Sequence, residues 1–172
     1  MVLKDRIAIV TGGSSGIGRG VALEFAREGA KVCVADIQEA PKRGKYHETD
    51  VTTTTVEEIE KLGGEGLFVE TDMGAEDQIG RMVEKTVERF DGLDILVNNA
   101  GIHIPGGVTD LAVDDWDRVM GVNLRGLFLS TKASVSHLKK SSAGRIIHIA
   151  SVHAYGGGGG PAYAPAKAGV VN

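Results

Sequence analysis

A tyrosine and a lysine four positions apart, Tyr163 and Lys167, carry the clearest chemical signal in the sequence. On a helix, side chains at this spacing share one face, so the lysine ammonium can lie close to the tyrosine hydroxyl. A nearby positive charge stabilises the phenolate and makes the phenol a usable acid or base near neutral pH. The pair therefore predicts a proton-transfer site.

A glycine-rich turn near the start of the chain indicates a second chemical role. Residues 11–18 read T-G-G-S-S-G-I-G and follow a short apolar run. Glycines at a strand-to-helix turn let the backbone approach a pyrophosphate, whose charge is favoured at the helix N-terminus. The G-x-G-x-x-G spacing is absent, so the turn alone also fits a tight connection without a ligand. The positions that we expect to contact a dinucleotide are Gly12, Ser14, Ser15, Gly16, Ile17 and Gly18.

Asp36 ends the next apolar run, where a carboxylate can accept hydrogen bonds from the hydroxyls of an adenosine ribose. The same carboxylate would repel a 2′-phosphate, and no arginine or lysine stands at positions 13–15 or 37 to bind one. The sequence therefore predicts NAD(H) in preference to NADP(H). The alternative, an ordinary aspartate at a strand end, is weakened by the glycine turn that precedes it.

Composition and charge narrow the class of protein. The chain has 172 residues and a formal charge of −4, which suits one domain and a small-molecule partner and argues against a nucleic-acid surface. We expect a cytoplasmic protein, because the start resembles no secretory leader and no apolar stretch reaches about 18 residues. Cys33 is the single cysteine and the five histidines lack metal-ligand spacing, so we expect no disulfide and no metal.

Short β-branched runs alternate with longer amphipathic stretches, the pattern of βαβ units in a parallel sheet. The runs are almost uniformly apolar, so helices should cover both faces of the sheet. This predicts an α/β fold in a single domain over residues 1–172. Expected strands are Ile7–Thr11, Lys31–Asp36, Gly66–Glu70, Leu93–Asn98 and Arg145–Ser151, and expected helices are Gly16–Glu28, Thr53–Leu62, Ala75–Phe90, Asp114–Leu138 and one beginning near Tyr163.

Two segments interrupt this pattern. Residues 38–55 contain a basic patch and a run of threonines, which predicts a polar surface excursion before the second helix. The glycines at 156–160 disfavour regular structure, so we expect a mobile loop beside Tyr163.

In their order along the chain, these features resemble the short-chain dehydrogenase/reductase family. The stretch N-N-A-G at 98–101 follows the fourth expected strand, Asn123 lies within the long helix, and Ser151 precedes Tyr163 and Lys167. The resemblance covers essentially the whole chain. It implies a Rossmann-like, doubly wound α/β/α fold that is incomplete after the Tyr-x-x-x-Lys helix begins. It also implies hydride transfer between a nicotinamide and a secondary alcohol or ketone.

The resemblance assigns a role to each residue of the expected catalytic set. Tyr163 would be the acid and base, and Ser151 would hydrogen-bond the substrate oxygen as charge develops on it. Lys167 would assist Tyr163 and also hold the nicotinamide ribose. Asn123 would position a water molecule that extends the proton relay.

Further cofactor contacts are implied at the ends of later strands. Asp72 and the Met73 backbone would meet the adenine edge, and we prefer Asp72 to the similar Asp50 because a clear strand precedes it. Asn99 would lie along the cofactor, although it could equally tie neighbouring strands together. The segment expected to run beside the cofactor is Asn99, Ala100 and Gly101, followed by Tyr163 and Lys167.

Three features bear on completeness and assembly. Pro165 stands between Tyr163 and Lys167, which suits a helix only near its start. The helix at 114–138 has apolar residues on more than one side, and relatives use it for subunit contacts, so we expect a homodimer or homotetramer. A chain that ended at Asn172 would leave a sheet edge unpaired and would be poorly soluble.

The sequence leaves the substrate open. Residues 146–153 are similar to members that act on 3-oxoacyl or 3-hydroxy-acid substrates, but sugars and simple secondary alcohols remain alternatives, and His103 and His153 are candidates to face the substrate. A non-catalytic dinucleotide-binding or scaffolding protein is a second class. A third is a serine hydrolase, since residues 12–16 fit G-x-S-x-G around Ser14, although no earlier strand could supply an oxyanion hole.

Overall fold

The computed structural model describes residues 1–43, 50–156 and 158–172. Parallel strands form a five-stranded sheet in the order β3-β2-β1-β4-β5. The strand order reverses between β1 and β4, and parallel α/β sheets bind ligands beyond the carboxyl ends of the strands at such a point. The predicted Rossmann-like α/β fold is confirmed. The strands are β1 (Ile7–Thr11), β2 (Lys31–Asp36), β3 (Gly66–Glu70), β4 (Ile95–Asn98) and β5 (Arg145–His148).

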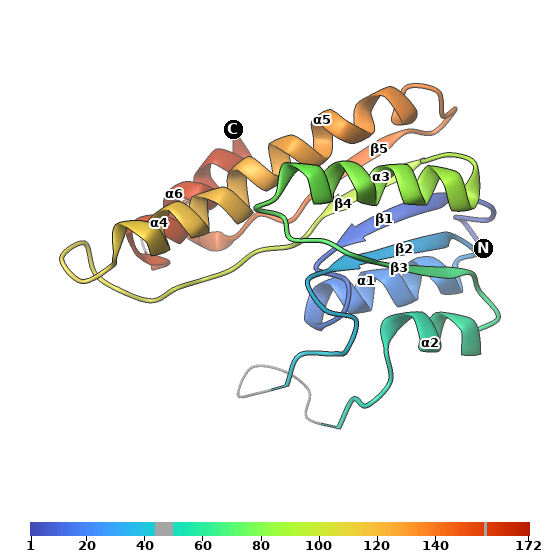
Figure 1. Cartoon of the computed structure of the whole chain (residues 1–172), viewed down its shortest axis with the longest axis horizontal. Helices are drawn as coiled ribbons and strands as arrows, with labels where there is room; N and C mark the ends of the chain where they lie inside the picture. Colours follow the sequence, from blue (N-terminus) through green and yellow to red (C-terminus); the bar gives the residue numbers. More distant parts are fainter. Residues whose placement is uncertain (44–49, 157) are drawn as a thin grey trace.

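Helices cover both faces of this sheet, as Figure 1 shows. α1 (Gly16–Arg27) and α2 (Thr55–Lys61) lie on one face, and α3 (Glu76–Phe90) and α5 (Gly126–Leu138) lie on the other. Toward the carboxyl ends of the strands, α4 (Val113–Met120) packs against α6 (Gly160–Val171). The result is a three-layer α/β/α arrangement.

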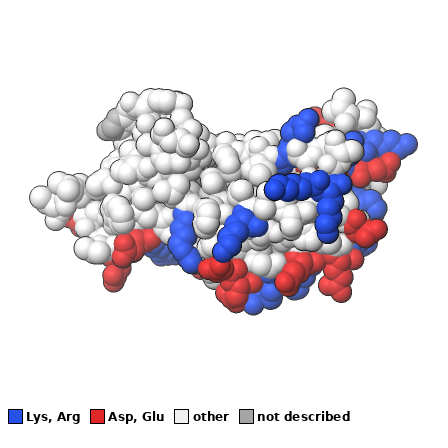
Figure 2. Space-filling model, turned by 90° about the horizontal axis from the view of Figure 1, so that it is seen from above, with Lys and Arg blue, Asp and Glu red and all other residues white. Residues whose placement is uncertain are grey.

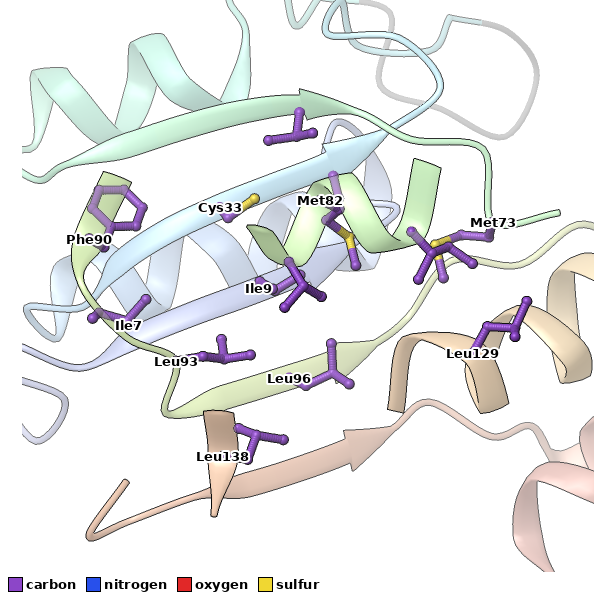
Figure 3. Packing of buried hydrophobic residues seen from close by; sticks show 14 residues of the cluster. Ile7, Ile9, Cys33, Met73, Met82, Phe90, Leu93, Leu96, Leu129 and Leu138 are labelled. Carbon is purple, nitrogen blue, oxygen red and sulfur yellow. The ribbon is translucent and has the colours of Figure 1, made fainter. Parts of the chain in front are cut away.

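The larger apolar cluster lies between the sheet and helices α3 and α5. Met82 of α3 and Leu129 of α5 belong to one cluster with strand residues such as Ile9 and Leu96, all of which Figure 3 labels. Burial of each such side chain contributes roughly 1.5–3 kcal/mol to the stability of the folded state. Cys33 belongs to this cluster, has no exposed surface, and burial raises the pKa of its thiol to about 12, so it is a core residue.

Three of the predicted strands have the predicted bounds, whereas β4 and β5 are shorter than expected. β4 begins at Ile95, because its ladder with β1 begins where Ile95 pairs with Ala8. β5 ends at His148, opposite the last residue of β4. Ser151 therefore lies beyond the strand, where its hydroxyl caps a short 3₁₀ turn, η2 (Val152–Ala154), by accepting the His153 N–H at 3.2 Å.

The stretch predicted as one helix at 114–138 is helical throughout, but it is not a regular α-helix. A π-helical turn, η1 (Gly121–Arg125), separates α4 from α5 and contains Asn123. The chain packs closely just after this π-helical turn. A Cβ on Gly126 would collide with the carbonyl oxygen of Met73. Turns of this kind occur frequently at functional sites.

α6 begins at Gly160, three residues before the expected start, so Pro165 lies inside the helix. Proline has no N–H, and the carbonyl of Pro161, four residues earlier, therefore lacks its helical donor. The indole N–H of Trp116 in α4 donates to that carbonyl at 3.1 Å. A neighbouring helix thus supplies the missing hydrogen bond.

The part of the 38–55 excursion at 44–49 and Gly157 of the glycine run lie outside the described residues. The end of the excursion is tied to α1 and the glycine turn: Thr55 donates to the Gly13 carbonyl at 2.8 Å and accepts from Arg19 at 3.1 Å. Thr54 caps α2 through a reciprocal pair of hydrogen bonds with Glu57.

Across the described ranges, none of the helices is both long and apolar enough to cross a membrane.

Candidate active site

A groove of about 790 Å³ lies at the carboxyl ends of the strands, where the strand order reverses. The glycine turn forms one wall, and the segments after β2, β3 and β4 form much of the rest. Asp50 does not line it, whereas most of the residues expected to contact a dinucleotide do. These are Gly12, Ser15, Gly16, Ile17, Asp36, Asp72, Met73, Asn99, Ala100 and Gly101.

The glycine turn is packed so closely that it requires its glycines. Gly12 has a φ of +65°, and a Cβ there would lie 2.9 Å from the Ala100 Cα, while a Cβ on Gly18 would collide with the Gly12 carbonyl oxygen. Gly18 is thus a packing position behind the groove and does not line it. Omitting these side chains leaves the backbone open for the close approach of a pyrophosphate.

Ser14 lies beneath the turn. Its side chain is fully buried, and its backbone N–H donates to Asp36 Oδ2 at 3.2 Å. Its hydroxyl has no hydrogen-bond partner among the residues that the structure describes. A nucleophilic serine needs an adjacent base and access to substrate, so this geometry argues against the serine hydrolase alternative.

Asp36 is buried at the end of β2, and its carboxylate faces the groove. Its oxygens accept the backbone N–H groups of Ser14 and Ile37, the latter at 2.9 Å. A basic group also lies here: Lys42 Nζ is 3.8 Å from Asp36 Oδ1. Lys42 was not among the positions considered from the sequence, which were 13–15 and 37, although the basic patch of the excursion was the signal for it.

Asn99 lines the groove and also ties two strands together. Its side chain donates to the carbonyls of Thr11 and Gly12 at 2.9 and 3.2 Å. The backbone N–H groups of Asn99 and Ala100 donate to the Thr11 hydroxyl, both at 3.0 Å. The β1 and β4 ends are thereby fixed relative to each other, as the structural alternative for Asn99 predicted.

Lys167 and Asn123 meet near the end of the groove. Lys167 Nζ donates to the Ile149 carbonyl at 2.6 Å, and burial lowers the pKa of this lysine. The Asn123 amide forms two hydrogen bonds with the Ile102 backbone, each 2.8 Å long. Both side chains adjoin Gly101, where an added Cβ would lie 3.2 Å from Asn123 Oδ1 and 3.7 Å from Lys167 Nζ.

Tyr163 lies near one lysine and two histidine side chains. Lys167 Nζ lies 5.8 Å from the centre of its ring. Two imidazole rings stand edge-on to it, with ring centres 5.2 Å away for His103 and 6.1 Å away for His153. The turn that begins with Ser151 packs against α6, which carries Tyr163.

Among the described residues, no group of three or more His, Cys, Asp or Glu side chains is arranged to hold a metal ion. The groove instead offers features of a dinucleotide site, which are a glycine turn at a helix N-terminus and a strand-end carboxylate that faces an open groove.

Comparison with known proteins agrees with this geometry. The sequence model described as short chain dehydrogenase matches residues 6–172. The chain is 39% identical over 171 residues to (2S)-[(R)-hydroxy(phenyl)methyl]succinyl-CoA dehydrogenase subunit BbsD of Thauera aromatica, covering 99% of this chain and 65% of that protein. It is 39% identical to (+)-borneol dehydrogenase 2 of Salvia officinalis, covering 96% and 56%.

A further relative is the 3-oxoacyl-[acyl-carrier-protein] reductase of Synechocystis, 37% identical over 98% of this chain and 65% of the relative. The chain therefore spans more than half, but less than two thirds, of the length of these relatives. The family match extends over nearly all of the chain, which belongs to the short-chain dehydrogenase/reductase family.

Proposed function

We propose that the protein is an NAD(P)-dependent oxidoreductase that interconverts a secondary alcohol and a ketone. The observation that carries this proposal is the position of the Lys167 ammonium, which is buried between the Ile149 carbonyl and the Tyr163 ring beside the groove. A bound nicotinamide would accept or supply the hydride. The residues of the chain would orient the substrate and move the proton.

Tyr163 is the proposed acid and base. The Lys167 charge favours the phenolate, because an opposite charge nearby stabilises an ionised group. Ser151 Oγ already accepts the His153 N–H, which leaves its own O–H free to donate to the substrate oxygen. The serine would therefore hold the oxygen that exchanges a proton with Tyr163.

Asn123 is the proposed water-binding end of the proton relay. Its amide uses one donor and one acceptor position on Ile102, which leaves one hydrogen and one lone pair for a water molecule. The side chains of Asn123 and Lys167 both adjoin Gly101. A water there could pass a proton from the lysine toward solvent.

The proposed cofactor is NAD(H). Two backbone N–H groups fix the Asp36 carboxylate, which would accept the adenosine ribose hydroxyls. Asp72 and Met73 line the groove near the end of β3, where they would meet the adenine. Titration with NADH and NADPH should give the smaller dissociation constant for NADH. Equal or tighter binding of NADPH would contradict the preference.

The substrate class to test first is a 3-hydroxyacyl or 3-oxoacyl compound. Two relatives are named for a hydroxy(phenyl)methylsuccinyl-CoA and for a 3-oxoacyl group on acyl carrier protein. A third is named for borneol, so a simple secondary alcohol is the comparison substrate. Both classes present an oxygen that Ser151 and Tyr163 could bind.

The test of the proposed function is Tyr163→Phe in the full-length protein. Removal of the hydroxyl should lower turnover by at least about 10²-fold, since general acid and base catalysis contributes roughly 10²–10⁴-fold. The dissociation constant for NADH should stay within a few-fold, because the phenol is assigned the proton. Retention of more than about a tenth of the activity would place the proton transfer elsewhere. Cofactor binding by a wild-type protein without turnover would favour a non-catalytic dinucleotide-binding protein.

We also propose a homo-oligomer that buries the α4–α5–α6 face. Phe128 is 60% exposed and lies with Met120, Leu124 and Leu127 around a second, largely apolar hollow. In Figure 2, charged side chains gather toward one end of the molecule, and the end at which Figure 1 places α4 and α6 is largely uncharged. Phe128→Glu should dissociate the oligomer in light-scattering measurements. A monomeric wild-type protein would overturn this assignment.

A further inference from the structure

The segment after β2 turns back across the wall of the groove and brings Lys42 to the site proposed for the adenosine ribose. The Lys42 backbone N–H donates to the Ser15 hydroxyl at 2.7 Å, which anchors the segment to the residue that precedes α1. Ser15, Asp36 and Lys42 all line the same groove. The lysine is therefore held at the site by its backbone, independently of its side chain.

The Lys42 ammonium lies close to the Asp36 carboxylate but does not form a direct hydrogen bond with it. The distance of 3.8 Å exceeds the 2.7–3.2 Å of a direct N–H···O hydrogen bond. Backbone N–H groups already occupy both carboxylate oxygens. The lysine side chain is 38% exposed, whereas that of Asp36 is 5% exposed. The ammonium thus retains donors that can turn toward another anion in the groove.

The other charged groups that line the groove belong to different elements. Glu70 and Asp72 lie at the end of β3, and Asp117 and Arg118 belong to α4. Lys42 is the basic group that the structure pairs with Asp36. Together the two side chains carry almost no net charge, so the repulsion that Asp36 alone would exert on a phosphate is largely cancelled.

We propose that Lys42 determines cofactor specificity by supplying the counter-charge for a phosphate on the 2′-oxygen of the adenosine ribose. The site then accepts NADP(H) with a smaller loss of affinity than Asp36 alone would cause. This inference rests on the proposed function, which makes the groove a dinucleotide site. It also assigns a role to the basic part of the excursion after β2.

The size of the effect follows from the exposure of the lysine. Hydrogen bonds to charged groups contribute about 1.5–3 kcal/mol, which corresponds to roughly a tenfold change or more in a dissociation constant. A partly exposed ammonium belongs at the lower end of this range. We therefore expect about a tenfold effect on NADPH and less than about twofold on NADH, which lacks the phosphate.

The test is fluorescence titration of NADH and NADPH into wild-type protein, Lys42→Gln and Lys42→Arg. Lys42→Gln should raise the dissociation constant for NADPH about tenfold and leave that for NADH nearly unchanged. Lys42→Arg should retain most of the NADPH affinity. The matched control is Lys61→Gln, because Lys61 pairs with Glu58 on α2 and does not line the groove. NADH binding reports directly that each variant is folded.

The outcomes separate this inference from the proposed function. If the wild-type protein binds NADH but Lys42→Gln changes both affinities equally or neither, the role of Lys42 is overturned and the proposed function stands. If the wild-type protein binds neither dinucleotide, both fail. The NADPH effect should also shrink as ionic strength rises from about 0.1 to 1 M, because salt screens exposed charges.

Discussion

Asp94 and Asp36 occupy opposite ends of the same sheet, and their surroundings differ. Asp94 directly precedes β4 at the amino end, where its carboxylate accepts the Ile7 backbone N–H at 2.9 Å, an Arg6 N–H at 3.1 Å and the Ser141 hydroxyl. Asp36 ends β2 at the carboxyl end and faces the groove. The Asp94 carboxylate is surrounded by hydrogen-bond donors of the chain, whereas the Asp36 carboxylate is open toward the groove.

The pKa of Asp94 expresses this difference. Burial alone would raise it, but the hydrogen bonds from Ser141, Ile7 and Arg6 together outweigh burial and hold the pKa below its ordinary value. The Asp94 cluster links the starts of β1 and β4 with the segment before β5. The amino end therefore uses its polar groups for stability, whereas the carboxyl end keeps hydrogen-bonding capacity for ligands.

The largest expected effect comes from the carboxyl end. Lys167→Met should lower turnover by at least about 10²-fold and should also weaken NADH, because the ammonium is assigned both to Tyr163 and to the nicotinamide ribose. Unfolding by urea should change much less than activity. The control is Lys85→Met on the exposed side of α3, which should leave both readouts unchanged. Retained turnover in Lys167→Met would contradict the claim that the polar groups at the carboxyl end serve function.

Asp94→Asn should show the opposite pattern. The variant should lose about 2 kcal/mol of unfolding free energy near pH 7, because charge-assisted hydrogen bonds at a mostly buried site are weakened. NADH affinity should stay unchanged. Since the folded-state pKa of Asp94 is lowered, its stabilisation is present above the unfolded pKa and is lost as pH falls through the folded pKa. The difference from wild type in urea unfolding should thus narrow in acid, and a constant difference would contradict this account.

The sequence predicted the strands of the sheet better than the contacts of the site. Strands such as Ile7–Thr11 and Lys31–Asp36 were found with the same bounds, because continuous apolar β-branched runs encode buried parallel strands locally. The π turn around Asn123 was missed, since it accompanies packing of Gly126 on the distant Met73. Contacts of this kind depend on the fold and leave no periodic signal.

The groove illustrates the same limit for the site residues. The glycine turn and Asp36 could be predicted, because each stands at a strand end with a fixed geometric role. The basic patch that contains Lys42 was visible in the sequence, but its position beside Asp36 was not, because only the folded segment after β2 brings the two side chains together. The burial of Ser14 beneath the turn was likewise invisible in a serine-rich turn sequence.

Asp36→Asn is the matched counterpart of Asp94→Asn. It should cost about 1–2 kcal/mol of unfolding free energy, because an amide oxygen can accept only one of the two backbone N–H groups that the carboxylate now accepts. The ratio of NADPH to NADH dissociation constants should fall about tenfold, since the charge that repels a 2′-phosphate is gone while Lys42 remains. A large loss of stability with an unchanged ratio would make Asp36 a structural residue like Asp94.

The smallest expected effect concerns the support of α6, which carries Tyr163 and Lys167 at the carboxyl end. The Trp116 N–H donates to the Pro161 carbonyl that Pro165 leaves without a helical donor, and this bond is exposed, unlike those of Asp94. Trp116→Phe should therefore cost only about 1 kcal/mol of unfolding free energy.

A double-mutant cycle with Pro165→Ala isolates this bond from the other contacts of the indole ring. In the Pro165→Ala background, the backbone N–H gained at position 165 can donate to the Pro161 carbonyl, so Trp116→Phe should cost less there than in the wild-type background. The coupling should be roughly 0.5–1 kcal/mol by urea unfolding. Turnover should fall with Trp116→Phe alone and recover partly in the double variant, because the replaced hydrogen bond restores the start of α6. Equal costs in both backgrounds would show that the indole supports α6 only by packing.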